Sequence, residues 1–420
     1  MNARALLVLS FVGVACGPPP VPPCDQSKVG NICTIAGAGT NGYSGDDGPA
    51  LKAEMSLPQD TLTSSDGTTF ILDWNNHRIR KVGSDGVMRA VAGRGELGGT
   101  LDDPANSDFN HPTAMVFDAQ GNIIIAAWHN SKIRKLDLTT NAIVDTCGDG
   151  RRAYFGDNGP AITAALDLPT SIAFAPNGNL IVMDQANMVL RSIDPAGNIS
   201  LYAGHCVIDA PMPAGPGACA SGVAPVACPM MSGKTTCGVP MEQCSKPCTP
   251  GYAGDEGPAT AMRIAQPFGQ SADPGGRIAF DSAGNLFFAD TSNAIIRKID
   301  AQGVVHRIAG TAPVAGVAQK GFSGDEGPAT SALLNNPVDL AFGGDGTLYF
   351  TDTYNHCVRS IDTAGVIHTV VGTCGTPGTT GDDGPAKSAL LKRPYGLEVV
   401  GDVLKISDTG NNRIRVVKLK

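Results

Sequence analysis

The stretch VDLAFGGDGTLYFTDTYNHCVRSIDTAGVIHTVV, residues 338–371, contains the pattern that decides the fold. Its apolar runs at 338–342, 347–352, 357–362 and 366–371 are short, and turn sequences rich in Gly, Asp and Asn separate them. A strand, a tight turn and a strand, three times in succession, predict a four-stranded antiparallel meander.

Two signatures recur along the chain at the borders of such units. The first, Gly-Asp-(Asp/Glu/Asn)-Gly-Pro-Ala, occurs at 45–50, 156–161, 254–259, 324–329 and 381–386, with a degraded copy at 101–105. The second, Asp-x-x-Asn-x-x-(Ile/Val/Leu)-Arg, occurs at 73–80, 184–191, 290–297, 352–359 and 408–415, and Ala127 replaces its Asp at 127–134. Six four-stranded units predict an all-β fold, a six-bladed β-propeller.

The segment NICTIAG, residues 31–37, resembles the fourth strand of a unit but has no unit before it. The last unit stops at Lys420 after its third strand. We therefore expect strand 31–37 to complete the last blade and close the ring, which removes an open sheet edge.

The signature residues have structural interpretations. Pro328 suits the first position of a helical turn in the link between blades. Asp352 and Asn355 are expected to hydrogen-bond the backbone of their tight turn. Arg359 is expected to pair with a neighbouring blade or a carbonyl group rather than with a substrate.

These repeats resemble the NHL-repeat family, most clearly in GYSGDDGPALKAEMSLP (42–58), DTYNHCVRSID (352–362) and DTGNNRIRVV (408–417). The resemblance covers about residues 29–420 apart from one insertion, and it is specific for the fold. The family includes protein-binding and RNA-binding platforms, bacterial cell-wall-associated proteins and the lyase domain of peptide-amidating enzymes. The resemblance therefore implies a propeller without choosing a function.

The N-terminus resembles the signal peptide of bacterial lipoproteins. Residues 1–15 are predicted to be the signal peptide, with Arg4 in its charged start and an apolar stretch at 5–15. GVAC at 13–16 resembles a lipobox in which Cys16 is lipidated. We expect a Pro-rich spacer at 16–28, the propeller at 29–420 and a location at the cell envelope, with anchoring in the outer membrane favoured. Simple secretion is the alternative.

Composition excludes other classes of protein. The net charge of −8 and the lack of a long basic run argue against nucleic acid as a partner. With 53 Gly and 30 Pro residues in 420, the chain suits many short strands joined by turns. A monomer is expected.

Cysteines concentrate in one insertion, residues 205–253, between the third and fourth blades. Disulfides are expected there, because the spacing lacks the CxxC pairs of zinc sites; the cysteines are Cys206, Cys219, Cys228, Cys237, Cys244 and Cys248. Cys357 and Cys374 lie near paired positions of one blade and are expected to form a disulfide, and Cys24 and Cys33 are a second candidate pair. Cys147 has no obvious partner.

Candidate binding residues lie in the turns between the second and third strands, on the face that also carries the links between blades. We call this the top face. Trp74 and Trp128, the only tryptophans, occupy equivalent turns of adjacent blades. The same set of turns contains Tyr354, His77, His129 and His356. Aromatic rings with polar neighbours suit a sugar ring, a peptide or a protein; alternatively, the two indoles pack against the insertion or the links. A metal held by His77, His129 and His356 is not favoured, because blades one, two and five do not bring them together.

A second candidate site is the channel mouth, next to the Pro residues that open the inner strands. Asp60 and Asp339 lie two positions after such a Pro, and His111 and Arg393 directly precede one. The two carboxylates could hold a cation such as calcium; no other cofactor is expected. The alternative is that they are solvated or bonded within turns.

The sequence favours an exported, lipid-anchored propeller that binds a protein or polysaccharide in the cell envelope through its top face. One alternative is a metal-dependent lyase or hydrolase at the channel mouth, for which only His111 is well placed. The sequence has no GxSxG, HExxH or phosphate-loop motif. Another alternative is a purely structural envelope protein.

Overall fold

The computed structural model describes residues 24–99, 104–207, 226–227, 235–236, 248–268 and 272–420. Several predicted features lie outside the described residues: the signal peptide, Cys16, most of the spacer, Cys219, Cys228, Cys237 and Cys244.

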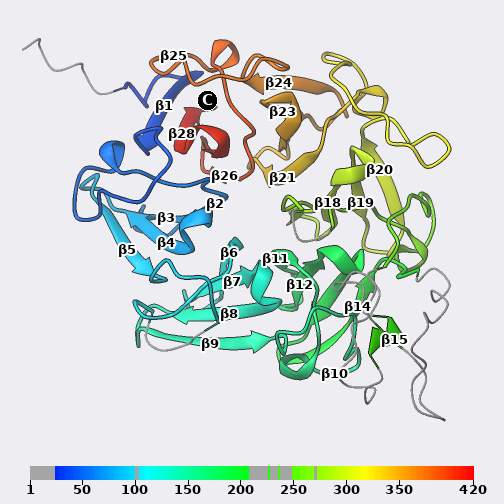
Figure 1. The fold of residues 1–420 in the computed structure, drawn as a ribbon. Helices are drawn as coiled ribbons and strands as arrows, with labels where there is room; N and C mark the ends of the chain where they lie inside the picture. The colour runs from blue at the N-terminus through cyan, green and yellow to red at the C-terminus, as the bar shows by residue number, and fades with distance from the viewer. Residues whose placement is uncertain (1–23, 100–103, 208–225, 228–234, 237–247, 269–271) are drawn as a thin grey trace, which may run out of the picture.

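Six four-stranded antiparallel sheets are arranged radially, as predicted (Figure 1). Blades one to three consist of β2 (Asp60–Thr63), β3 (Thr69–Asp73), β4 (Arg78–Val82), β5 (Met88–Ala92); β6 (Pro112–Phe117), β7 (Ile123–Ala127), β8 (Lys132–Asp137), β9 (Ala142–Cys147); and β11 (Pro169–Phe174), β12 (Leu180–Asp184), β13 (Val189–Ile193), β14 (Asn198–Ala203). Blades four to six consist of β17 (Ile278–Phe280), β18 (Leu286–Asp290), β19 (Ile295–Ile299), β20 (Val305–Ala309); β21 (Pro337–Phe342), β22 (Leu348–Asp352), β23 (Cys357–Ile361), β24 (Ile367–Val371); and β26 (Leu397–Val400), β27 (Val403–Asp408), β28 (Arg413–Lys418) with β1 (Asn31–Ala36). Apolar side chains of neighbouring blades pack together to form the core.

The closure of the ring by the N-terminal strand is confirmed. β1 is the fourth strand of blade six and pairs antiparallel with β28, with Ile32 opposite Val417. Figure 1 shows the two ends of the chain meeting in this blade. A short strand β25 (Gly384–Pro385) from the preceding link covers the outer side of β1.

The two signatures stabilise each other. In blade five the Arg359 guanidinium bonds Asp352 of the second signature and Asp325 of the first, with N–O distances of 3.3 and 2.6 Å. It also donates to the carbonyl oxygens of Leu333 and Ser323. The partners belong to the same blade and its preceding link, so the expected contact with a neighbouring blade is wrong and the expected carbonyl contact is correct.

The expectation that the Asp and Asn of the second signature bond the backbone of their own turn is wrong, because their backbone partners lie in the preceding link. Asp352 accepts the backbone N–H of Asn335, and the Asn355 amide donates to Gly321 O and to Asp352. Each blade is thereby fixed to the link that precedes it. In blade two, Ala127 replaces the turn Asp and the link signature is degraded. Arg134 Nε, the atom that bonds the link Asp in blade five, instead lies 3.0 Å from Asp145.

Short 3₁₀ turns occur at two repeated places. Those in the links are η1 (Ala50–Lys52), η4 (Ala161–Thr163), η7 (Ala259–Ala261), η9 (Ala329–Ser331) and η11 (Ala386–Ser388). Those between second and third strands are η2 (Trp74–Asn76), η3 (Trp128–Asn130), η5 (Gln185–Asn187), η8 (Thr291–Asn293), η10 (Thr353–Asn355) and η12 (Thr409–Asn411). Pro328 precedes its turn as the cap residue instead of occupying its first position. The first Gly of the link signature is required sterically, because a Cβ on Gly45 would lie 2.6 Å from Ala53 Cα.

Three disulfides join described cysteines. Cys357–Cys374 lies within blade five, and Cys24–Cys33 fixes the segment before β1 to that strand. Cys206–Cys248 joins the two ends of the insertion, within which β15 (Val226–Ala227) pairs with β16 (Thr235–Thr236). Cys147 is a buried free thiol.

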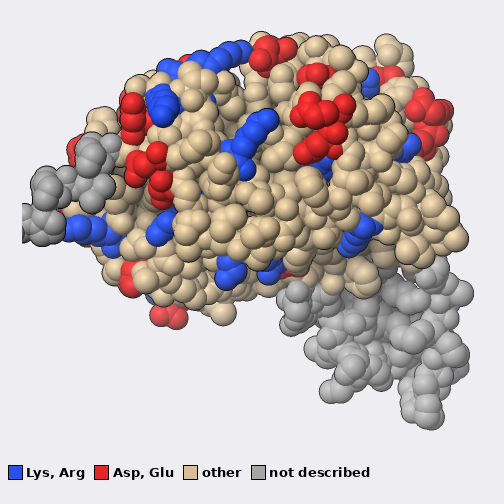
Figure 2. All heavy atoms as spheres, turned by 90° about the horizontal axis from the view of Figure 1, so that it is seen from above, with Lys and Arg blue, Asp and Glu red and all other residues tan. Residues whose placement is uncertain are grey.

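The surface carries charges of both signs. Figure 2 shows acidic and basic side chains interspersed on the face seen from above. Among the described residues, no helix has the length and apolar character needed to cross a membrane.

Candidate functional site

A buried arginine crosses the central channel. Arg277 precedes β17 of blade four, and its Nη1 lies 3.1 Å from Asp60 Oδ2 of blade one and 3.7 Å from Asp339 Oδ2 of blade five. Its Nη2 donates to the carbonyl oxygens of Gln59 and Thr113. The guanidinium therefore connects four blades at the axis of the ring.

This arrangement corrects the cation-binding interpretation of Asp60 and Asp339. Both carboxylates do line the channel, but the charge that they hold is Arg277, and each also accepts a backbone N–H, from Met115 and Leu397 respectively. Burial raises the pKa of Asp60 to about 7, although Arg277 acts to lower it. A cavity of about 230 Å³ lies on this cluster among apolar side chains of the inner strands.

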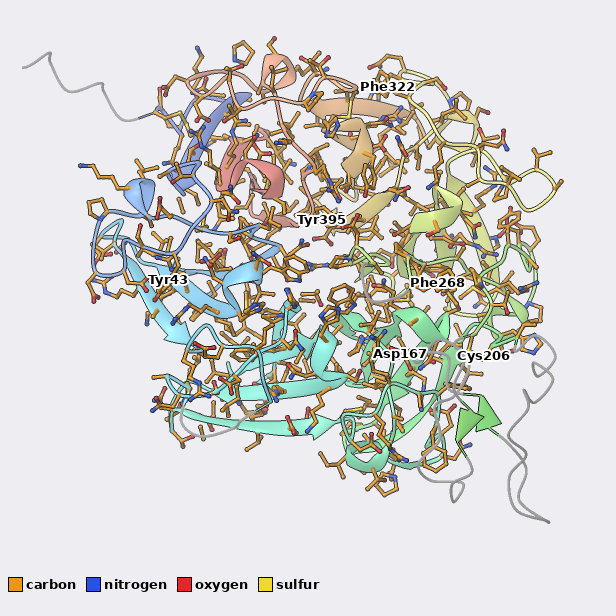
Figure 3. The ribbon with its side chains drawn as sticks, in the orientation of Figure 1. Tyr43, Asp167, Cys206, Phe268, Phe322 and Tyr395 are labelled. Atoms are coloured by element: carbon orange, nitrogen blue, oxygen red, sulfur yellow. A yellow bond between two sulfur atoms is a disulfide. The ribbon has the colours of Figure 1, made fainter. Side chains whose placement is uncertain are left out.

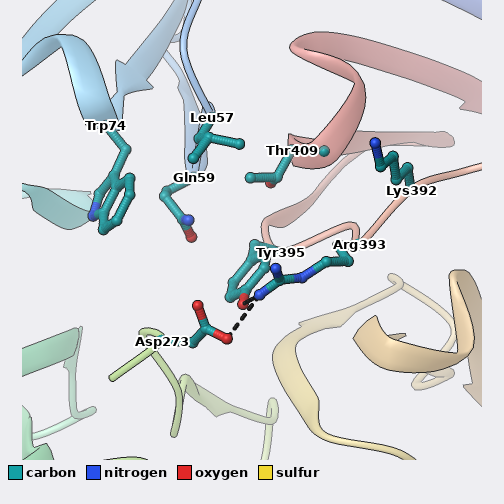
Figure 4. Close-up of a pocket in the computed structure, with 9 residues that line it drawn as sticks. Leu57, Gln59, Trp74, Asp273, Lys392, Arg393, Tyr395 and Thr409 are labelled. Atoms are coloured by element: carbon teal, nitrogen blue, oxygen red, sulfur yellow. Dashed lines mark hydrogen bonds and ion pairs between the residues drawn. The ribbon is translucent and has the colours of Figure 1, made fainter. Parts of the chain in front are cut away.

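A separate pocket of about 250 Å³ opens at the channel mouth on the top face (Figure 4). The lining side chains come from links and turns of blades one and six and from the segment before β17: Leu57, Gln59, Trp74, Asp273, Lys392, Arg393, Tyr395, Thr409 and Gly410. Figure 3 places Tyr395 close to the centre of the ring, whereas Tyr43 and Phe322 lie near the rim. The links and turns that the sequence placed on one face thus form the pocket.

One wall of the pocket is an ordered polar network. Arg393 Nη2 lies 2.7 Å from Asp273 Oδ2 and donates to the hydroxyl oxygens of Tyr395 and Tyr354, at 2.8 and 3.1 Å. The Tyr354 hydroxyl donates to Asp273. Burial raises the pKa of both phenols, so Tyr354 and Tyr395 are neutral at pH 7. Arg393, predicted at the mouth, and Tyr354, predicted in a turn, therefore belong to the same site.

Three buried polar atoms of the pocket residues have no hydrogen-bond partner within the described part of the chain: Trp74 Nε1, Gln59 Oε1 and Arg393 Nε. Buried polar groups are normally paired, and an unpaired one costs about 1–3 kcal/mol. Trp74 Nε1 and Arg393 Nε are donors, and Gln59 Oε1 is an acceptor. A ligand that offers both hydroxyls and acceptor oxygens would satisfy them after small side-chain shifts, since all three atoms are almost fully covered.

For Trp128 the structure agrees with the packing alternative and not with an exposed binding residue. Its side chain is 1% exposed and stacks on His129 with a centroid distance of 4.1 Å. It packs with Leu168, Ala186 and Trp74, so the burial of apolar surface explains its position. Trp74 is half-buried and lines the pocket.

His77, His129 and His356 do not form one cluster, but two of them contact His111. His111, at the mouth, lies between His77 and His129, with ring centroids 4.3 and 4.9 Å away, and it also contacts Trp74 at 4.4 Å. Burial lowers the pKa of His111 to about 3 and that of His129 to about 4, so both imidazoles are neutral at pH 7. Their Nδ1 atoms lie 3.2 Å apart, and Asn110 Oδ1 is 2.8 Å from His111 Nδ1. Through His111, the cluster packs against the Trp74 ring.

His356 lies in blade five, away from this cluster, and its Nδ1 accepts the backbone N–H of Arg393 at 3.1 Å. It therefore positions Arg393 at the mouth. Sequence reasoning missed Gln59, Tyr395 and Arg277. For Arg277 a signal exists, because aligning RIAF (277–280) with DLAF (339–342) places Arg277 in register with Asp339.

Comparison with protein families agrees with the repeat pattern. A family model described as the teneurin NHL domain matches residues 317–380, which span the end of the link before blade five, blade five itself and the start of the next link.

Curated relatives match over most of this chain. Protein SUPPRESSOR OF QUENCHING 1, chloroplastic, from Arabidopsis thaliana is 26% identical over 385 residues, 88% of this chain and 30% of that protein. NHL repeat-containing protein 2 from Homo sapiens is 25% identical over 366 residues, 83% of this chain and 44% of that protein. The chain thus spans less than half the length of these relatives.

Solved structures share the architecture. A protein of unknown function from Bacteroides thetaiotaomicron has a TM-score of 0.60 at 13% identity, covering 92% of this chain and 75% of that chain. An auxiliary nutrient binding protein from the same species has a TM-score of 0.56 at 14% identity with the same coverage. At these identities the likeness shows the fold alone. The matched NHL model, the NHL-repeat relative and the six-bladed ring together support an NHL-repeat β-propeller.

Proposed function

We propose that this protein is a binding module of the cell envelope that holds a sugar ring of a polysaccharide in the pocket at its channel mouth. The observation that carries the proposal is the set of unpartnered polar atoms on Gln59, Trp74 and Arg393 around an aromatic-lined pocket of about 250 Å³. A sugar presents a flat apolar face that packs on indole, and hydroxyls that donate and accept hydrogen bonds. The volume suits one ring.

A propeller from Bacteroides ovatus is also described as an auxiliary nutrient binding protein, with a TM-score of 0.55. That description agrees with the proposal, although function has to be argued from the site and not from the fold. The pocket favours a sugar over a folded protein partner, because it is a small concave volume instead of a broad surface.

The site supports the lyase or hydrolase alternative less well. The carboxylates of Asp60 and Asp339 bond Arg277, and His77, His111 and His129 bond or stack on one another. These groups thus have structural partners. A purely structural role would leave the unpartnered donors and acceptor of the pocket without explanation.

Trp74→Ala is expected to weaken saccharide binding at least tenfold, because central buried aromatic residues typically contribute 2 kcal/mol or more to binding. The measurement is binding of the pure protein to an array of neutral and acidic oligosaccharides, followed by titration calorimetry with the best ligand. Phe155→Ala is the matched control, since Phe155 is an aromatic residue, 55% exposed, that does not line the pocket. Equal loss in both variants, or none in Trp74→Ala, would contradict the siting.

We further propose that the protein is exported and anchored in the outer membrane through a lipidated Cys16. The three disulfides support an oxidising compartment. Cys16→Ser is expected to move the protein from the membrane fraction to the soluble fraction, because the acyl chains are lost. Cys147→Ser, which removes a thiol that is free in the structure, is the control. A Cys16→Ser protein that stays in the membrane fraction would rule out this anchor.

A further inference from the structure

The pocket at the channel mouth differs in charge from the chain as a whole. Its nine lining residues include two cations, Lys392 and Arg393, and one anion, Asp273, which leaves one net positive charge. The chain carries a net charge of −8. A positive pocket on an acidic protein favours an anionic ligand. The negative charges on the rest of the surface repel an anion, whereas the positive charge of the pocket attracts it.

The charged groups are not equivalent. Asp273 is neutralised by Arg393, at 2.7 Å, and its Oδ2 also accepts the Tyr354 hydroxyl. Lys392 is exposed at the rim, and no side-chain ion pair or hydrogen bond involves its ammonium group among the described residues. Lys392 is therefore the cation that remains available to a ligand.

The donors and acceptors are also separated within the pocket. In Figure 4, Trp74 and Gln59 lie on one side and Lys392 on the other, beyond Thr409, while the Arg393 guanidinium reaches back past Tyr395 to the Asp273 carboxylate. Gln59 Oε1 requires a donor, and Arg393 Nε requires an acceptor. A ring that packs on Trp74 would thus direct hydroxyls to the first side and an anionic oxygen to the second.

From this juxtaposition we infer that the ligand is an acidic sugar, a uronate residue whose ring contacts Trp74 and whose carboxylate faces Lys392 and Arg393 Nε. The inference rests on the proposed saccharide-binding function and narrows it to one class of polysaccharide. Charge-assisted hydrogen bonds from Lys or Arg to a carboxylate are roughly twice as strong as neutral ones. The carboxylate would therefore decide the preference for acidic over neutral sugars.

The test compares matched ligands that differ only in charge. Oligomers of galacturonate, glucuronate and mannuronate are titrated against the full protein as free acids and as methyl esters, which keep the ring and lose the charge. We expect at least one free acid to bind about tenfold tighter than its ester at low salt, and this preference to shrink as ionic strength rises.

Lys392→Gln supplies the second arm. Lys392 is exposed at the rim, so the variant is expected to fold normally. It should lower the affinity for the free acid to that for the ester and leave the ester unchanged. Equal binding of acid and ester, or an acid preference that survives Lys392→Gln, overturns the inference but leaves the saccharide proposal standing. Binding of no acidic or neutral saccharide, or binding only of peptides with a free C-terminal carboxylate, overturns both.

Discussion

A protein lacking residues 24–36 is expected to lose cooperative folding of the whole ring. The deletion removes β1, whose residues Ile32, Cys33 and Ala36 have no exposed surface, and with it the pairing to β28 and β25. Blade six would keep three strands, and β28 would become an unpaired edge. The expected loss is comparable with the total stability of a typical domain, about 5–15 kcal/mol.

Urea unfolding followed by circular dichroism measures this effect. Ile32→Ala provides a graded version and should cost about 2–5 kcal/mol, because it leaves a cavity between blades five and six. Val29→Ala is the control and should change stability by less than about 0.5 kcal/mol, since Val29 is 56% exposed. A synthetic peptide of residues 24–37 added to the truncated protein should restore the transition. A truncated protein that unfolds at the original midpoint would show that the ring does not depend on this strand.

The fold was predictable because nearly every unit repeats the same network of charged side chains. The Arg of the second signature needs the Asp seven residues before it and the Asp of the link, as Arg359, Asp352 and Asp325 illustrate. Such a network requires a fixed number of residues between the Asp and the Arg. This spacing can be recognised from the sequence alone. Blade two, whose link signature is degraded, keeps one of these contacts, because Asp145 on the neighbouring strand bonds the Arg134 Nε that the link Asp bonds in other blades.

The site was only partly predictable, because it depends on contacts between blades. Such contacts produce no regular spacing of residues in the sequence. Trp74 was found, since an unusual residue in a repeated turn is visible by comparison with its equivalents. Trp128 is buried, and His77, His111 and His129 cluster, because turns and links of neighbouring blades contact one another. The position of a residue within its repeat does not reveal such contacts. Arg277 was missed because blade four has Gly275 at the position where the other blades have the Pro at or just before the inner strand.

Replacing Arg277 by Met is expected to destabilise the protein by about 3–5 kcal/mol at pH 7, the range measured when one partner of a buried ion pair is removed. The change leaves the Asp60 and Asp339 carboxylates facing each other in the channel with no cation between them. It also removes two hydrogen bonds to the carbonyl oxygens of blades one and two. Urea unfolding at pH 7 gives the magnitude.

The cause can be separated from lost packing by the pH dependence of the free energy of unfolding. Burial already raises the pKa values of Asp60 and Asp339 in the folded protein, and Arg277 acts to lower both. Without Arg277 the folded pKa values rise further above the unfolded value, so the folded state binds more protons than the unfolded state over a wider range. Stability then falls as pH rises through that range. The deficit of Arg277→Met should therefore be smaller at pH 5 than at pH 8, and Asp60→Asn with Asp339→Asn in the same chain should recover part of it. A deficit that is the same at both pH values would mean that Arg277 acts through its packing and carbonyl contacts rather than by holding the two carboxylates.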